Sequence, residues 1–276
     1  MTDPSSVPGT RRSLVAGSFD DLRLADVRLL EEAARCGPVH AVLWSDEAVC
    51  GWTGEPPKFP LAERQYLVES LRYVDRVSTC EALPALDQRP PGTWVVRESE
   101  DSEDKRQHCR RMEWHYQVVP EQLLQQVPPC PEGTREGAPG RKRVLVTGCF
   151  DWFHSGHVRF FEEVAALGEL YVVVGHDANI RLLKGAGHPL FPQAQRRYMV
   201  GAVRCVRQAL VASGDGWLDA EPEIRRIRPQ IYAVNADGDR PEKRAYCEAN
   251  GIEYRVLQRT PKPGLPPRKS TDLRGF

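Results

Sequence analysis

The apolar positions of this chain fall into short runs, and segments with helical spacing separate these runs, most regularly in the second half. The apolar runs predict strands at 144–146, 171–174, 209–211, 231–234 and 254–257. The segments between them predict helices at 156–167, 192–203, 217–227 and 242–250, the last closed by Gly251 in a left-handed cap. Short strands alternating with helices are typical of an α/β fold with a parallel sheet covered on both faces. Ligands of such sheets bind beyond the carboxyl ends of the strands.

The second half also repeats the first. Residues 11–20 (RRSLVAGSFD) resemble residues 142–151 (KRVLVTGCFD), so that Gly17 and Gly148 stand 131 positions apart. Further matches follow in order: Phe59-Pro60 with Phe191-Pro192, Arg64 with Arg196, and Lys105-Arg106 with Lys243-Arg244. The sequence therefore predicts two homologous Rossmann-like domains, 11–121 and 142–276. The segment 122–141, rich in Pro, Gly and Gln, is the predicted linker.

Composition narrows the classes of function. Lys plus Arg and Asp plus Glu both number 38, which removes the simplest argument for nucleic-acid binding. No apolar run approaches the roughly 18 residues that span a bilayer, and the N-terminus lacks the shape of a signal peptide, so we expect no membrane insertion. The eight cysteines include no Cys-x-x-Cys pair. We expect free thiols, a cytoplasmic protein and no protein metal site.

The candidate chemistry lies directly after the first strand of the second copy, in residues 148–157 (GCFDWFHSGH). Here His154 and His157 open a predicted helix, whose N-terminus offers unpaired N–H groups and a partial positive charge to a phosphate. The two imidazoles add donors directed at the same anion. Gly156 between them would permit the close approach of a nucleotide. This pattern suits a reaction that builds negative charge on phosphorus.

The stretch resembles the His-x-Gly-His signature of the nucleotidyltransferase superfamily, which includes the phospho-alcohol cytidylyltransferases and several adenylyltransferases. Such a motif alone is equally compatible with a helix start that carries two surface histidines. The flanking residues match the family in order, namely Gly-x-Phe-Asp, residues 158–161, Gly175-His176-Asp177, Lys184-Gly185 and Gln195-Arg196-Arg197. The tandem layout is similar to that of phosphoethanolamine cytidylyltransferases.

The resemblance implies direct nucleotidyl transfer from a nucleoside triphosphate to a phosphorylated alcohol or sugar, with release of pyrophosphate. It implies catalytic roles for His154, His157 and Lys184. The implied nucleotide-binding residues are Gly148, Cys149, Phe150, Gly156, Arg196, Arg268, Ser270 and Thr271. Mg²⁺ is expected with the triphosphate. CTP is the first expectation and ATP the alternative, and a nucleotide-binding regulator without turnover is the alternative from another class.

Several roles have a structural alternative. Lys184, in a predicted polar loop, is also compatible with an ordinary solvated lysine. Arg196 is equally compatible with a structural role, because Arg64 holds the matching place in the first copy. Either Arg259 or Arg268 could bind phosphate, and we prefer Arg268 because it lies beside Ser270.

The first copy lacks the features that carry the chemistry. Arg23, Ala25, Asp26 and Thr53 stand where His154, Gly156, His157 and Lys184 stand in the second copy. An aspartate at a phosphate-binding helix start would repel the ligand. We therefore expect an inactive first domain that packs on the second as an intramolecular pseudo-dimer, in a monomeric chain.

Overall fold

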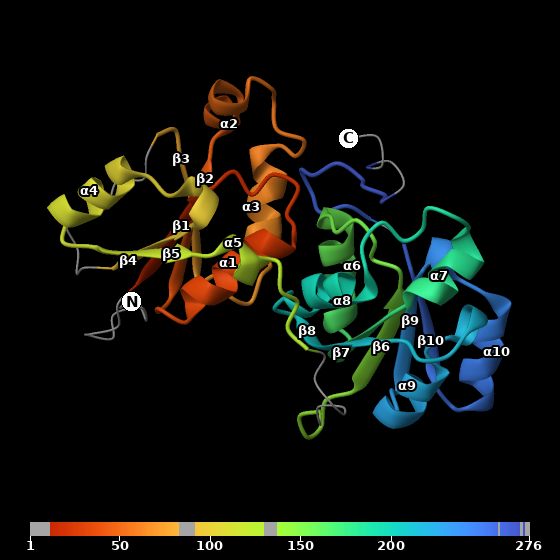
Figure 1. Ribbon diagram of the computed structural model, residues 1–276. Coiled ribbons are helices and arrows are strands. Elements are labelled where there is room, and N and C mark those ends of the chain that lie inside the picture. The colour runs from red at the N-terminus through yellow and green to blue at the C-terminus, as the bar shows by residue number, and fades with distance from the viewer. Residues whose placement is uncertain (1–11, 83–91, 130–136, 259, 271–272, 274–276) are drawn as a thin grey trace. The chain divides into compact units, whose positions relative to one another are not determined.

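Two five-stranded parallel sheets form the framework of the computed structural model, and each belongs to a separate unit (Figure 1). The units are Met1–Gln126 and Val127–Phe276, and the boundary falls inside the predicted linker segment. The structure describes residues 12–82, 92–129, 137–258, 260–270 and 273. The predicted α/β class with two parallel sheets is confirmed.

The first unit has its first strand at the centre of the sheet, in the order β3-β2-β1-β4-β5. Its strands are β1 Ser13–Gly17, β2 Val39–Trp44, β3 Arg76–Cys80, β4 Thr93–Arg97 and β5 His115–Val119. Its helices are α1 Leu24–Ala34, α2 Asp46–Thr53, α3 Leu61–Glu69, η1 Glu98–Glu100, α4 Glu103–Arg111 and α5 Glu121–Leu124. A core that includes Leu14, Trp94 and Cys109 fills one side of this sheet.

The second unit has the corresponding strand order, β10-β9-β6-β7-β8, again with the first strand of the unit in the centre. Its strands are β6 Arg143–Gly148, β7 Glu169–Val174, β8 Val206–Val211, β9 Ile231–Asn235 and β10 Glu253–Leu257. Its helices are α6 Ser155–Ala165, α7 Asp177–Lys184, α8 Gln193–Gly201, η2 Gly216–Leu218, α9 Glu221–Ile227, η3 Ala236–Gly238 and α10 Pro241–Ala249. Figure 1 shows α6 and α8 on one face of the sheet and α9 and α10 on the other.

The five predicted strands of the second half are confirmed, but one helix prediction is wrong and one helix was not predicted. The predicted helix 217–227 is two pieces, η2 and α9. Pro222 lies in the first turn of α9, where its missing N–H is tolerated, and the preceding residues cannot continue as one helix through it.

Helix α7 was not predicted. Lys184 is the last residue of this helix, and its predicted place in a polar loop is therefore wrong. His176 caps this helix, because its Nδ1 accepts from the Asn179 N–H at 3.2 Å. Histidine is not among the usual N-cap residues, so the sequence carries only a weak signal for this start.

The buried apolar residues explain why the sheets form where they do. Val144, Leu145 and Val146 of β6 are fully buried, as expected for a central parallel strand covered on both faces. The seven described cysteines are free thiols, as expected, and Cys130 lies outside the described residues. Within the described ranges, no helix has the length and apolar character required to traverse a bilayer.

Candidate active site

A cavity of about 350 Å³ opens at the carboxyl ends of β6, β7 and β9 in the second unit. Residues of the β6–α6 turn, α7, η2, the β9–α10 connection and the C-terminal segment line it. The lining residues predicted from sequence are Gly148, Cys149, Phe150, His154, His157, Lys184 and Ser270. The structure thus gathers these residues at the sheet edge where ligands of parallel sheets bind.

The two motif histidines are stacked at the N-terminus of α6. Their ring centroids lie 3.9 Å apart with an angle of 22° between the planes. His154 is the N-cap of the helix, and its Nδ1 accepts from the Gly156 N–H at 3.1 Å. A neutral His154 therefore carries its proton on Nε2, so this edge of the ring is the donor. The helix start and the rings together direct positive partial charge into the cavity.

The turn before α6 is fixed by its own packing. Phe150 adopts a left-handed backbone with φ 50°, which is rare for a bulky residue. Its ring lies over Gly148, where a Cβ would stand 2.7 Å from the Phe150 Cζ. The Asp151 carboxylate accepts from the N–H groups of Leu190 and Phe191 at 2.8 and 3.0 Å. Gly148 is therefore required by the fold of this turn, independently of any ligand.

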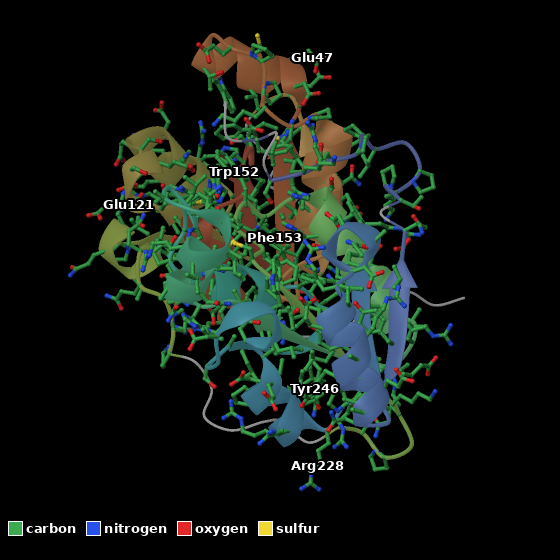
Figure 2. The ribbon with its side chains drawn as sticks, turned by 90° about the vertical axis from the view of Figure 1, so that its right-hand side faces the viewer. Glu47, Glu121, Trp152, Phe153, Arg228 and Tyr246 are labelled. Carbon is green, nitrogen blue, oxygen red and sulfur yellow. The ribbon has the colours of Figure 1, made fainter. Side chains whose placement is uncertain are left out.

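Trp152 and Phe153, whose side chains are labelled in Figure 2, complete this turn and are buried at 8% and 5% exposure. The Trp152 ring meets Phe191 edge-on at 5.9 Å. Phe153 packs against His157 with 5.9 Å between ring centroids. The His157 ring thus lies between the rings of Phe153 and His154, where it lines the cavity.

Arg196 does not line the cavity, and its guanidinium is used by the protein itself. Only 1% of the residue is exposed. It donates to the carbonyl oxygens of Phe191, Cys149 and Gly175 and to Asp177 Oδ1, at 2.6 to 2.8 Å. The structure therefore supports the structural alternative for Arg196 and leaves its donors occupied.

The C-terminal segment reaches the same region. Ser270 Oγ donates to the Trp152 carbonyl at 3.2 Å, and Lys269 and Ser270 line the cavity. Arg268 instead lines a second, small cavity, together with Ser155 and Gly156 at the start of α6. A Cβ on Gly156 would lie 3.2 Å from the Arg268 carbonyl oxygen. Gly156 thus permits the close approach of this segment, and Arg259 and Thr271 lie outside the described residues.

The floor of the cavity holds a buried polar cluster that sequence reasoning missed. Lys243 of α10 is 8% exposed, and its Nζ donates to Thr147 Oγ1 at 3.3 Å. Thr147 Oγ1 and the Tyr232 hydroxyl share a hydrogen bond of 2.7 Å. Asp219 completes the cluster and accepts from Asn179 Nδ2 at 3.0 Å. The repeat contained a signal for Lys243, since Lys105 matches it, but nothing local marked it as part of a site.

Burial controls the charges of this cluster. Desolvation lowers the pKa of Lys243, and the nearby Asp219 carboxylate opposes that shift. Desolvation likewise raises the pKa of Asp219, against the effects of Asn179 and Lys243. Each group is therefore held in a medium that penalises its charged form.

Trp217 and Arg240 lie at the rim and were also missed. The Arg240 guanidinium stands 4.6 Å from the centroid of the Trp217 ring, within range of a cation–π contact. Trp217 is 42% exposed although it is large and apolar. Both residues line the cavity beside Asp237, so the rim combines an aromatic surface with both signs of charge.

The equivalent place in the first unit is filled by ion pairs. Arg23 is the N-cap of α1, and Asp26 occupies the third helical position. Arg23 pairs with Asp21, and Arg97 Nη2 pairs with Asp26 Oδ1 at 2.5 Å. The helix start that would meet a phosphate is thus faced by carboxylates with cationic partners.

The described side chains do not form a site for a resident metal ion. Among the residues that the structure describes, no group of three or more His, Cys, Asp or Glu side chains could hold a metal ion. The Asp151 carboxylate, which lines the cavity, already accepts backbone N–H groups.

Known proteins are similar in sequence to the unit that carries this site. The model of the family described as cytidylyltransferase-like matches residues 145–274. The FAD synthase of Methanocella paludicola is 36% identical over 135 residues, which cover 48% of this chain and 93% of the synthase. The FAD synthase of Ferroglobus placidus is 34% identical over 120 residues, covering 42% of this chain and 75% of the synthase.

Two further similarities are more limited, one in the share of the related protein that it covers and the other in the structural agreement. The bifunctional protein HldE of Methylococcus capsulatus is 39% identical over 99 residues, 36% of this chain, and the match spans about a fifth of the HldE protein (20%). A solved structure of a lipopolysaccharide core biosynthesis protein from Thermoplasma volcanium aligns with a TM-score of 0.38 and 25% identity. That alignment covers 45% of this chain and 99% of the other.

Proposed function

The chain belongs to the cytidylyltransferase-like family of nucleotidyltransferases, and on that premise we propose that its second unit joins a nucleoside monophosphate to a phosphorylated small molecule. An oxygen of the acceptor phosphate attacks the α-phosphorus of a nucleoside triphosphate. The bond from the α-phosphorus to the bridging oxygen breaks, and pyrophosphate leaves with that oxygen and its electron pair.

The observation that carries this proposal is the stacked pair His154 and His157 at the N-terminus of α6, open to the cavity. Charge develops on the α-phosphate and on the bridging oxygen during the transfer. Donors already fixed at that place stabilise this charge without reorganising at the moment of reaction. Neither histidine needs to act as a nucleophile, and no covalent enzyme intermediate is required.

Lys184, Lys269 and Ser270 surround the same cavity and can hold the outer phosphates. Lys184 lies at the end of α7 and is exposed, so its ammonium can move to meet the triphosphate. Positioning and electrostatics account for most of the catalysis in phosphoryl-type transfers, and this set supplies both. Arg196 has no part in the proposal, because its donors are bonded to the protein.

For the donor nucleotide we propose ATP ahead of CTP, which the sequence had put first. The match to a FAD synthase covers nearly all of that protein, and its product contains an adenosine phosphate. CTP stays as the second candidate, supported by the Lys184-Gly185 pair and the tandem layout.

Two measurements test the function and the nucleotide. Pyrophosphate release from ATP, CTP, GTP and UTP with Mg²⁺ is followed against a panel of phosphorylated alcohols, sugars and flavin mononucleotide. Turnover with ATP is expected, and turnover with CTP alone would restore the first sequence expectation. Nucleotides that raise the melting temperature without any turnover across the panel would favour a non-catalytic regulator.

The first unit is, in this proposal, a copy without transferase activity. Its support is the set of ion pairs of Arg23, Asp26 and Arg97 at the start of α1. Thr53 ends α2 where Lys184 ends α7, so the mobile ammonium is also missing. The expectation of a monomeric chain stays a prediction, which light scattering on the full-length protein tests.

A further inference from the structure

We propose that Lys243 is the residue that binds an anionic group of the acceptor, on the side of the cavity opposite the histidines. This inference rests on the proposed function for the identity of the two reactants. It rests on the structure alone for the claim that Lys243 binds an anion.

The first observation is the environment of the Lys243 ammonium. It is buried and donates a hydrogen bond to Thr147 Oγ1, and the ion pairs within 4.0 Å among the described residues include none of Lys243. An ammonium has three N–H donors, and a buried charge without a close partner is costly. Because Lys243 lines the cavity, a bound anion could accept from the remaining donors.

The second observation is the matched lysine of the first unit. Lys105 occupies the same position on α4, but its Nζ donates to the Glu100 carbonyl at 2.7 Å and lies 3.9 Å from the Glu100 carboxylate. Both lysines also lie over an aromatic ring. The Lys105 Nζ stands 6.0 Å from the centroid of the Trp94 ring, and the Lys243 Nζ stands 5.8 Å from that of the Tyr232 ring. The fold therefore places a lysine here in both units. The lysine of the second unit lines a cavity, whereas the lysine of the first is bonded to Glu100.

The third observation assigns this anion to the acceptor. His154 and His157 enter the cavity from α6, on one face of the sheet, and Lys243 enters from α10, on the other face (Figure 1). An in-line transfer requires the attacking oxygen and the leaving group on opposite sides of phosphorus. With the triphosphate at the α6 start, the side of α10 is left for the acceptor. The Thr147 hydroxyl beside Lys243 can add a donor or an acceptor to the same group.

The test uses full-length protein and sulfate, which remains a dianion across the pH range of proteins. Sulfate is titrated by calorimetry into wild type, Lys243→Met and the matched control Lys105→Met, each saturated with ATP and Mg²⁺ and without acceptor. Lys243→Met is expected to weaken sulfate binding by about tenfold or more, the loss expected for a charged hydrogen-bonding partner. Lys105→Met is expected to bind sulfate as the wild type does, and Lys243→Arg to retain part of the affinity.

The outcomes separate this inference from the proposed function. Equal sulfate affinities for wild type and Lys243→Met would overturn it, and so would a loss of ATP affinity that accompanies the loss of sulfate. Melting curves without ligand check the fold, and Lys243→Gln serves if the methionine variant unfolds. If wild type binds no nucleotide at all, the proposed function fails, while a sulfate site that depends on Lys243 still stands.

Discussion

Arg64 and Arg196 occupy matching buried positions in the two units and make the same hydrogen bonds. Each donates from Nε to a phenylalanine carbonyl five residues earlier, at 3.0 and 2.8 Å. Each donates from Nη1 to the carbonyl oxygen of the residue before the left-handed phenylalanine. Each donates from Nη2 to a carbonyl oxygen at or directly after the end of the second strand of its unit. These acceptors are Ser18 and Trp44 for Arg64, and Cys149 and Gly175 for Arg196. An aspartate completes each set, Asp46 and Asp177 respectively.

This matching geometry predicts that Arg196→Ala destabilises the second unit. The change removes a buried guanidinium and leaves its carbonyl partners and Asp177 without their donor. Loss of one partner from a buried charged network costs roughly 3–5 kcal/mol of the free energy of unfolding. Denaturant unfolding measures this, with the exposed Arg181→Ala as a control. A stable Arg196→Ala protein that had only lost nucleotide affinity would instead return Arg196 to the nucleotide site.

Substitution of the motif histidines is expected to reduce turnover while the fold persists. His154→Asn is the sharper variant, because asparagine is a good N-cap and keeps the cap on α6 while it removes the ring donor. We expect turnover to fall by about a hundredfold or more for His154→Asn and for His157→Ala, as for other lost transition-state donors.

The controls for the histidines lie at the matching positions of the first unit. Arg23→Ala and Asp26→Ala are expected to leave turnover close to that of wild type, measured by pyrophosphate release. Should either change abolish turnover in a protein that still melts at the normal temperature, the first unit takes part in the chemistry.

Gly156→Ala tests the fit between the C-terminal segment and the start of α6. Alanine normally favours a helix over glycine by about 1 kcal/mol. Here its Cβ would stand 3.0 Å from the His154 ring and 3.2 Å from the Arg268 carbonyl oxygen, so one of them must shift. We expect lower nucleotide affinity by calorimetry. Gly201→Ala in α8, whose Cβ would meet only the Ala209 Cβ at 3.5 Å, is the tolerated counterpart.

The lowered pKa of Lys243 predicts how sulfate binding depends on pH. Only the protonated lysine binds the anion, so affinity is present at low pH and is lost as pH rises through the pKa. Because burial lowers that pKa from 10.5, the loss begins at a lower pH than for an exposed lysine. The groups that face the ammonium are Asp219, Asp239, Arg240, Cys247 and the Tyr232 ring. Sulfate titrations at several pH values check this, and the sulfate affinity of Lys243→Met should not show this loss with rising pH.

The sequence by itself determined the class of fold and the position of the motif. Parallel strands buried on both faces leave apolar runs, and β6 to β10 lie where those runs predicted them. The stretch from Gly148 to His157 carries its chemistry locally, because the turn, the N-cap and the helix start are neighbours in the chain. Local neighbours are visible in a sequence, and so the histidines could be named before the structure.

The tertiary structure decided what depends on residues distant in the chain. For Arg196 the sequence left open both nucleotide binding and a structural role, and four acceptors from separate segments around its guanidinium favour the structural role. Lys243 looked like a marker of the repeat until packing buried it 3.3 Å from Thr147, 96 positions earlier in the chain. Burial, the hydrogen-bond donors that remain available and shifted pKa values are properties of a packed environment, which many distant residues create together. No local pattern could therefore tell the bonded lysine at position 105 from the one that lines the cavity.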